Sequence, residues 1–115
     1  MNTENTKMQI DPKREQRRSA LIAELRGSVA EVLQRFPGIS KIWIIGSVAK
    51  PLMFDMRSDM DIVVDGLPKE NYFDLFRFLE GRMSSKIDLI LLSDITEEDK
   101  SILDKKVVIY EKTVV

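Results

Sequence analysis

The feature that most constrains the fold of this chain is a series of short apolar runs separated by helical segments. Runs rich in β-branched and aromatic residues occupy residues 41–45, 60–64, 87–92 and 107–110, a pattern typical of β-strands. Strands that alternate with helices predict a small sheet covered by helices. Because the run 87–92 is apolar on both faces, we expect it to be a central strand. We expect the run 107–110 to be an edge strand.

The helical segments are marked by their apolar spacing and by their end signals. Residues 12–36 repeat apolar side chains on one helical face, after a capping Asp11 and before Pro37-Gly38. Residues 69–80 predict a second helix that Gly81 stops, and residues 93–96 lead into a short third one. Residues 1–10 show no periodicity, so we expect a flexible tail followed by a single domain over residues 11–115.

The composition excludes several classes of protein. The 115 residues include neither cysteine nor histidine, which excludes disulfides, zinc–thiolate sites and serine–histidine triads. The net charge of −1 gives no strong signal for nucleic-acid binding. No apolar run approaches the roughly 18 residues of a membrane helix, and the N-terminus lacks a secretory signal. We therefore expect a cytoplasmic protein whose chemistry depends on oxygen and nitrogen groups other than imidazole.

Three aspartates are candidate metal ligands. In strand geometry Asp59 and Asp61 share one face and lie roughly 7 Å apart at the backbone, so their oxygens can converge on one cation. Asp88 lies inside an apolar strand, where an unpaired buried charge would cost several kcal/mol, so we expect it to be paired, at the rim or ligating. If the two strands are neighbours, all three carboxylates meet at one end of the sheet. Mg²⁺ prefers such hard oxygen ligands together with substrate phosphates.

A candidate phosphate-binding segment directly follows the first strand. Gly46 ends the strand and Ser47 opens a short helical turn, which presents backbone N–H groups and a hydroxyl to an anion. Lys50 adds positive charge three residues later. The spacing of a Walker loop is absent. An Asp-x-Asp or a Gly-Ser pair alone is common on solvated surfaces, so the prediction depends on their combination with Asp88.

The segments 46–50 and 58–64 resemble the signature of the DNA polymerase beta-like nucleotidyltransferases, and more narrowly that of the minimal nucleotidyltransferases that are paired with HEPN toxins. The likeness covers about residues 38–111, the expected catalytic core, and includes Asp88 in the third acidic strand. It implies an α/β (α+β) nucleotidyltransferase fold, with a small mixed four-stranded sheet flanked by helices. Members often read Gly-Ser-Arg-Ala-Arg-Gly, whereas this chain has Val48, Lys50 and Pro51 at the variable places.

The resemblance also implies an activity and a partner. It implies transfer of AMP from ATP to a hydroxyl, with two Mg²⁺ ions held by Asp59, Asp61 and Asp88 and with the triphosphate held by Gly46, Ser47 and Lys50. In the toxin-paired members the acceptor is a tyrosine of the HEPN toxin, and the modification silences it. The chain is thus expected to be an antitoxin that acts as a protein adenylyltransferase.

Two other hypotheses remain open from the sequence. The first is a binding module of the same fold that neutralises its partner by occlusion, with little or no transfer. The helix 69–80 favours it, because its apolar arc exceeds the stripe that one buried face needs, and Phe73 or Phe78 is a candidate contact for a partner or a second copy of the chain. The second is a non-enzymatic acidic structural protein, which leaves Asp88 unexplained. The shortness of the chain further suggests that a partner completes the site.

Overall fold

The fold is a four-stranded sheet with two long helices packed on one face. The computed structural model describes residues 11–113, so the predicted tail 1–10 lies outside the described residues. The strands are β1 (Lys41–Ile45), β2 (Met60–Asp65), β3 (Ile87–Leu91) and β4 (Val107–Glu111), in the order β3-β2-β1-β4. β1 pairs antiparallel with β2 and β4, whereas β2 and β3 are parallel. The sheet is therefore mixed, as the resemblance implied.

The position of β3 differs from the prediction. We expected a central strand, but β3 lies at one edge of the sheet, and the predicted edge strand β4 lies at the other. Apolar residues occupy both faces of β3 because both faces are covered. Leu89 packs in the core between the sheet and the helices, and Ile90 packs against Trp43 and Val63 on the other face. Apolar content on both faces indicates coverage, which an edge strand also acquires when a chain segment folds over it.

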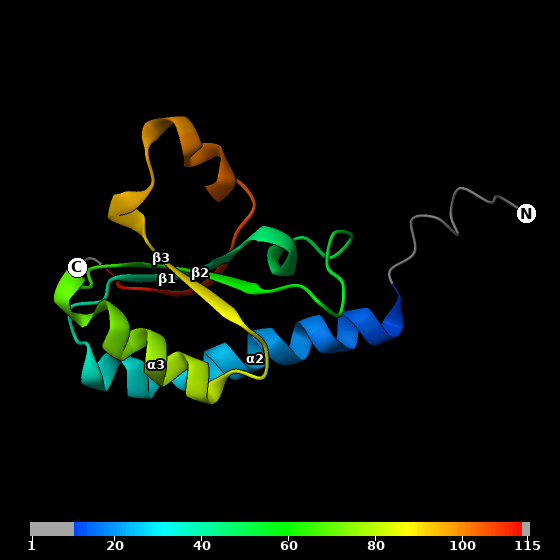
Figure 1. Ribbon diagram of the computed structural model, residues 1–115, viewed down its shortest axis with the longest axis horizontal. Helices are drawn as coiled ribbons and strands as arrows, with labels where there is room; N and C mark the ends of the chain where they lie inside the picture. Colours follow the sequence, from blue (N-terminus) through cyan, green and yellow to red (C-terminus); the bar gives the residue numbers. More distant parts are fainter. Residues whose placement is uncertain (1–10, 114–115) are drawn as a thin grey trace, which may run out of the picture.

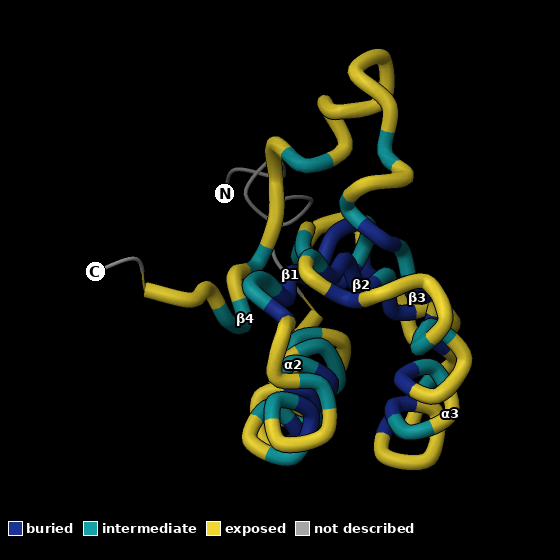
Figure 2. The backbone as a smooth tube through the Cα atoms, turned by 90° about the vertical axis from the view of Figure 1, so that its left-hand side faces the viewer, coloured by how far each residue is buried: buried dark blue, intermediate teal, exposed yellow. Residues whose placement is uncertain are grey.

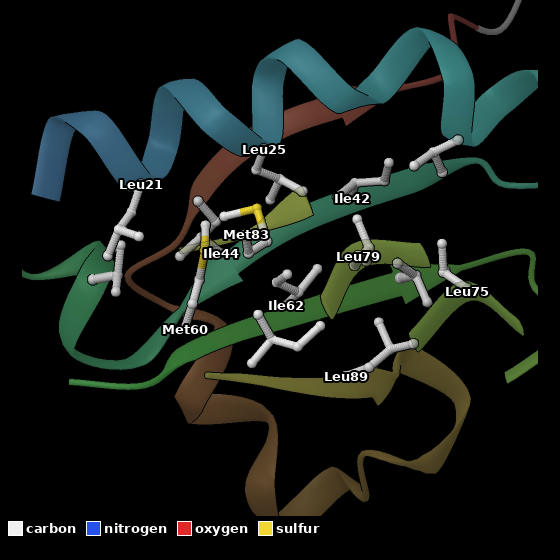
Figure 3. Close-up of a cluster of buried hydrophobic side chains, with 14 of the residues drawn as sticks. Leu21, Leu25, Ile42, Ile44, Met60, Ile62, Leu75, Leu79, Met83 and Leu89 are labelled. Atoms are coloured by element: carbon white, nitrogen blue, oxygen red, sulfur yellow. The ribbon is translucent and has the colours of Figure 1, made fainter. Parts of the chain in front are cut away.

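The helices α2 (Pro12–Arg35) and α3 (Tyr72–Arg82) form the layer below the sheet in Figure 1. The Asp11 side chain caps α2 by accepting a hydrogen bond from the backbone N–H of Lys13, as the sequence predicted. The core lies between this layer and the sheet, where Figure 3 shows the helix side chains meeting the inward side chains of the strands. Its labelled members are Leu21, Leu25, Ile42, Ile44, Met60, Ile62, Leu75, Leu79, Met83 and Leu89.

The bounds of α3 also differ from the prediction. Residues Lys69–Asn71 form a separate 3-10 turn, and α3 continues through Gly81 to Arg82. Gly81 does not stop the helix, because only Gly46 and Gly66 adopt positive φ among the described residues. No helix of the described range 11–113 is both long and apolar enough to cross a membrane.

The other face of the sheet, which we call the open face, carries only a partial cover. Residues 92–106 rise from the end of β3 and return to the start of β4 as an arch, which includes the short 3-10 helices Leu92–Asp94 and Glu97–Leu103. Figure 2 shows that most of this arch is exposed. Its apolar side chains Ile95 and Leu103 pack against a small second core formed by Trp43, Ile45 and Val63. The arch therefore covers part of the open face.

Polar side chains of α2 fix the loop that leads into β3. Arg17 donates hydrogen bonds to the Oγ of Ser84 at 2.7 Å and to its carbonyl oxygen at 2.9 Å. The Glu24 carboxylate accepts from the backbone N–H of Ser84 at 3.0 Å and from its Oγ at 2.7 Å. These contacts orient the entry to β3, the strand that carries Asp88.

Candidate functional site

Asp61 and Asp88 lie side by side on the open face of the sheet. They are direct partners in the parallel register of β2 and β3, and each is the second residue of its strand. Side chains alternate along a strand, so both aspartates point away from the core residues Met60 and Ile87. Asp88 is exposed and Asp61 is half-buried. Asp88 is thus at the rim, which was one of the three positions that the sequence allowed.

The pair creates an electrostatic conflict. The pKa of Asp61 is raised from 3.8 to about 6, mainly by burial, and also by the charge and hydrogen bonding of Asp88 and by the charge of Asp59. A carboxyl group whose neighbours are also acidic is stabilised in its neutral form, unless a cation supplies positive charge. The pKa of Asp61 therefore marks a place where added positive charge would be strongly favourable.

Asp59 lies beside this pair rather than within it. It precedes the first residue of β2 and its side chain is exposed. Among residues 11–113, no three acidic side chains form a compact group for a metal ion. The donor set nevertheless fits Mg²⁺, because that ion takes one or two protein carboxylates and completes its shell with water and phosphate oxygens. Asp61 and Asp88 supply two such carboxylates, and Asp59 is close enough to raise the pKa of Asp61.

Gly46 brings the turn after β1 directly against Asp61. The last residue of β1, Ile45, is the register partner of Asp61, and Gly46 follows with a φ of +72°. A Cβ at this position would overlap the Oδ2 of Asp61 and lie 3.3 Å from its Cγ. Glycine is required here both for the left-handed conformation and for the close approach of the carboxylate.

The turn Gly46–Ala49 is a single 3-10 helix, which we call the GSVA turn. Ser47 lies within it next to Gly46 and is half-buried, and Lys50 follows it and is exposed. Val48 is fully buried in the main core, so its side chain does not face the site. The structure thus places Gly46 and Ser47 at the same end of the sheet as the three aspartates, and Lys50 at the outer end of the turn.

A small apolar pocket adjoins the outer end of the GSVA turn. Its volume is about 300 Å³, and it is lined by Ala49, Lys50, Pro51, Leu52, Met53 and Lys105. Pro51 is thus part of the wall of this pocket. Leu52 and Met53 are 57% and 68% exposed, and Met56 in the same loop is 60% exposed. An apolar surface therefore borders the acidic site.

Sequence reasoning missed two residues that support the site. Arg18 of α2 donates a hydrogen bond to the carbonyl oxygen of Val48 at 2.8 Å, and Glu15 holds the same guanidinium through Nε at 3.0 Å. The hydrogen bond from Arg18 lowers the pKa of Glu15. No pattern in the sequence joins residues that are 30 positions apart, so this contact emerges only from the packing of α2 against the turn.

The fold is similar to those of several solved structures. A putative nucleotidyltransferase from Sulfolobus solfataricus has a TM-score of 0.62 and 24% identity, with 90% of this chain and 92% of that chain covered. A toxin–antitoxin with AMP-PNP has a TM-score of 0.63 and 18% identity, with 76% and 74% covered. A mutant of the toxin–antitoxin MntA–HpeT has a TM-score of 0.62 and 17% identity, with the same coverage. At these identities the similarity shows the fold.

No curated protein matches this chain. The sequence of residues 28–114 matches the family described as Polymerase beta, Nucleotidyltransferase. This stretch includes the GSVA turn and all three aspartates, and it covers most of the chain. The chain therefore belongs to the polymerase beta nucleotidyltransferase family.

Proposed function

We propose that this protein transfers AMP from ATP to a hydroxyl group, and that the acceptor is a tyrosine of a HEPN-type toxin that the transfer silences. The observation that carries the proposal is the juxtaposition of Asp61 and Asp88 with the glycine turn at Gly46 on one end of the open face. An acidic pair supports binding of a cation that carries phosphates, and a glycine turn admits those phosphates close to the backbone.

Each residue of the site has a role in this reaction. Asp59, Asp61 and Asp88 would hold Mg²⁺, with two ions expected, which neutralise charge on the triphosphate and on the leaving pyrophosphate when bound. Gly46 and Ser47 contact the triphosphate, and Lys50 adds positive charge near it. The acceptor oxygen forms a bond to the α-phosphorus as the bond to the bridging oxygen of pyrophosphate breaks. Asp88, the more exposed of the pair, receives the proton of the hydroxyl.

Two of the similar structures support the choice of nucleotide and partner. One is a toxin–antitoxin with the ATP analogue AMP-PNP, which supports ATP as the donor. The other carries two aspartate-to-glutamate mutations at positions two residues apart, the same spacing as Asp59 and Asp61. Both are toxin–antitoxin structures, which supports a toxin as the partner and an antitoxin role for this chain.

The transfer hypothesis is tested with α-labelled ATP, Mg²⁺ and the protein encoded by the neighbouring gene. We expect label on a tyrosine of that protein with the wild-type chain, and none with a variant that combines Asp59→Ala and Asp61→Ala. Asp104→Ala serves as the matched control, because this exposed aspartate lies in the arch and is not one of the proposed site residues. Failure of the wild-type chain to transfer label from any of the four nucleoside triphosphates would overturn the proposal.

Occlusion without transfer is the second candidate, and the exposed apolar side chains of Leu52, Met53 and Met56 favour it. Phe78, the other candidate for a partner contact, is instead half-buried and contacts the guanidinium groups of Arg35 and Arg82. The same assay separates the two hypotheses. Equal neutralisation of the toxin by the wild type and by the double aspartate variant, without label, would establish occlusion.

A further inference from the structure

The GSVA turn is held from outside by a single guanidinium group. Nη1 of Arg18, in the second turn of α2, donates a hydrogen bond of 2.8 Å to the carbonyl oxygen of Val48. Figure 1 shows the N-terminal half of α2 passing below this turn. The bond joins the N-terminal helix directly to the backbone of the segment that carries Ser47.

The guanidinium is itself held in place. Glu15, one helical turn earlier, accepts from Nε of Arg18 at 3.0 Å and from its Nη2 at 3.3 Å, so the carboxylate holds the guanidinium by its planar edge. The Arg18 side chain is only 14% exposed. A charged side chain that is buried to this degree and held on two sides has little freedom to adopt another rotamer, and its bond to the Val48 carbonyl is therefore maintained.

The turn is short and depends on few internal contacts. Its closing bond is from the backbone N–H of Lys50 to the carbonyl of Ser47 at 3.0 Å, and the next two bonds, from Met53 and Phe54, both end on the carbonyl of Lys50. A 3-10 helix of four residues has poorer hydrogen-bond geometry than an α-helix. The buried side chain of Val48 anchors the centre of the turn in the core, and the bond from Arg18 fixes the carbonyl of the same residue from outside.

We propose that Arg18, oriented by Glu15, is a positioning residue that holds the GSVA turn in the conformation that receives the triphosphate of ATP. This inference rests on the proposed function for the identity of the ligand. Both residues precede the stretch 28–114 that matches the nucleotidyltransferase family. The N-terminal part of α2 thus contributes to the site as well as to the core, although it lies outside the matched region.

The test compares Arg18→Ala, Arg18→Lys and Glu15→Gln with a matched control, Arg17→Ala. Arg17 is the neighbouring arginine of the same helix and also makes two hydrogen bonds, but to Ser84 in the loop before β3. Loss of Arg17 removes two tertiary hydrogen bonds, and loss of Arg18 removes one tertiary bond and the two bonds to Glu15. Only the loss of Arg18 is expected to release the GSVA turn.

The first readout is amide hydrogen exchange at Lys50, Met53 and Phe54, which needs no ligand. We expect exchange about tenfold faster in Arg18→Ala, an intermediate rate in Arg18→Lys, and no change in Arg17→Ala. Lysine can still donate to Val48 but cannot form the paired bonds to Glu15, so its rescue should be partial. Glu15→Gln should give a smaller increase, because the guanidinium remains but is held less firmly.

The second readout is the kinetics of AMP transfer. We expect Arg18→Ala to raise the KM for MgATP roughly tenfold with kcat reduced by less than about threefold, because the turn still reaches the bound conformation once ATP is present. Arg17→Ala should change the KM by much less than Arg18→Ala does, because the contacts of Arg17 end at the loop before β3 and not at the GSVA turn. A general loss of helix stability would affect both arginine variants alike and would not be rescued by lysine.

Two results would overturn the inference. One is unchanged exchange at residues 50, 53 and 54 in Arg18→Ala, and the other is an equal effect of Arg17→Ala on exchange and on KM. If the wild-type chain uses no nucleotide at all, the proposed function fails, but the exchange comparison still decides whether Arg18 holds the turn.

Discussion

At the scale of single residues, Asp61 combines a structural cost with a proposed functional role. It is half-buried between a glycine turn and a second carboxylate, and its pKa is raised to about 6, mainly by burial and also by repulsion from Asp88 and Asp59. A carboxyl group that served only stability would not be placed among like charges, because each neighbour disfavours its ionised form. Sites where a pKa is shifted by burial and by a specific charged partner are frequently functional.

The first prediction concerns the pH dependence of stability. The folded pKa of Asp61 exceeds its unfolded value of 3.8, so between about pH 4 and pH 6 the folded state holds the extra proton and unfolding releases it. The free energy of unfolding should therefore fall as the pH rises through this window and stay level above it. Asp61→Asn should stabilise the metal-free protein by roughly 1–2 kcal/mol at pH 7.5 and hardly at all at pH 3.5. This range allows for the screening of a partly exposed charge by solvent.

Denaturant unfolding in the presence of a chelator measures this difference, with Asp104→Asn as the control. Equal effects of Asp61→Asn at both pH values would contradict the assignment of the raised pKa. Excess Mg²⁺ should stabilise the wild type and not the variant, because the asparagine lacks the charge that attracts the ion.

The second prediction concerns Gly46. Gly46→Ala introduces a Cβ that overlaps the Asp61 carboxylate and forces alanine to a φ of +72°, so we expect a loss of about 1–3 kcal/mol in the free energy of unfolding. Gly27→Ala is the matched control, because Gly27 lies inside α2 with nothing within 4 Å of an added Cβ. That change should stabilise the protein by about 0.5–1 kcal/mol. An unchanged free energy of unfolding in Gly46→Ala would show that the turn accommodates the added Cβ without strain.

The residues that the sequence could predict are those whose roles follow from strand alternation and pairing. Alternation along β2 and the neighbouring position of β3 sufficed to bring Asp61 beside Asp88. Asp59 was expected to share that strand face, but it lies before β2, where the conformation of a loop decides its position. Arg18 and Glu15 could not be identified, because the approach of a helix to a distant turn leaves no local pattern in the sequence.

At the scale of elements, the arch 92–106 determines how the open face is used. It starts at the end of β3, crosses the face and returns at β4 (Figures 1 and 2). It packs on the second core, while Asp88 stays exposed and Asp61 half-buried. Because three apolar anchors, Leu92 next to β3 and then Ile95 and Leu103, attach an otherwise exposed segment, the stability of the arch depends on few contacts.

The third prediction follows from these anchors. Replacing Ile95 and Leu103 with alanine should release the arch, so that trypsin cleaves after Lys100 or Lys105 at least several times faster than in the wild type, while residues 11–91 stay protected. Ile102→Ala is the control, because this side chain is 44% exposed and contributes little packing. Mass spectrometry of the fragments measures the cleavage rates. Equal rates in the two variants would show that the anchors do not hold the arch.

The same arch explains why the order of the strands was only partly predictable. The existence and approximate bounds of the four strands follow from their β-branched composition and from the turn residues that flank them. The order does not, because Ile90 and Leu92 indicate only that the face is covered, and the cover comes from Ile95 and Leu103 rather than from another strand. The partners of a covered face are set by tertiary packing, which a single strand sequence does not encode.

At the scale of the whole molecule, the exposed apolar side chains fall into separate regions. Leu52, Met53 and Met56 lie in the loop that joins the GSVA turn to β2, next to the pocket lined by Lys50 and Lys105. Phe73 is 67% exposed, but it lies on α3, in the layer on the opposite side of the sheet (Figure 1). The first region lies between the GSVA turn and Asp59 in the chain, so under the proposed function we expect it to contact the partner that delivers the hydroxyl.

The fourth prediction separates these two surfaces. A variant that combines Leu52→Ser, Met53→Ser and Met56→Ser should lose at least about tenfold in kcat/KM for transfer to the protein acceptor, because it removes apolar area that the partner would bury. Its affinity for MgATP should stay near that of the wild type, since Asp61, Asp88 and the GSVA turn are intact. Phe73→Ser changes one equally exposed apolar residue on the other layer and should leave transfer unchanged. Steady-state transfer of label and titration of MgATP measure the two quantities. Reduced transfer in Phe73→Ser, together with normal transfer in the triple variant, would instead place the partner on the helical layer. A partner bound there would leave the open face uncovered, and its hydroxyl could reach the aspartates only by passing the edge strand β3.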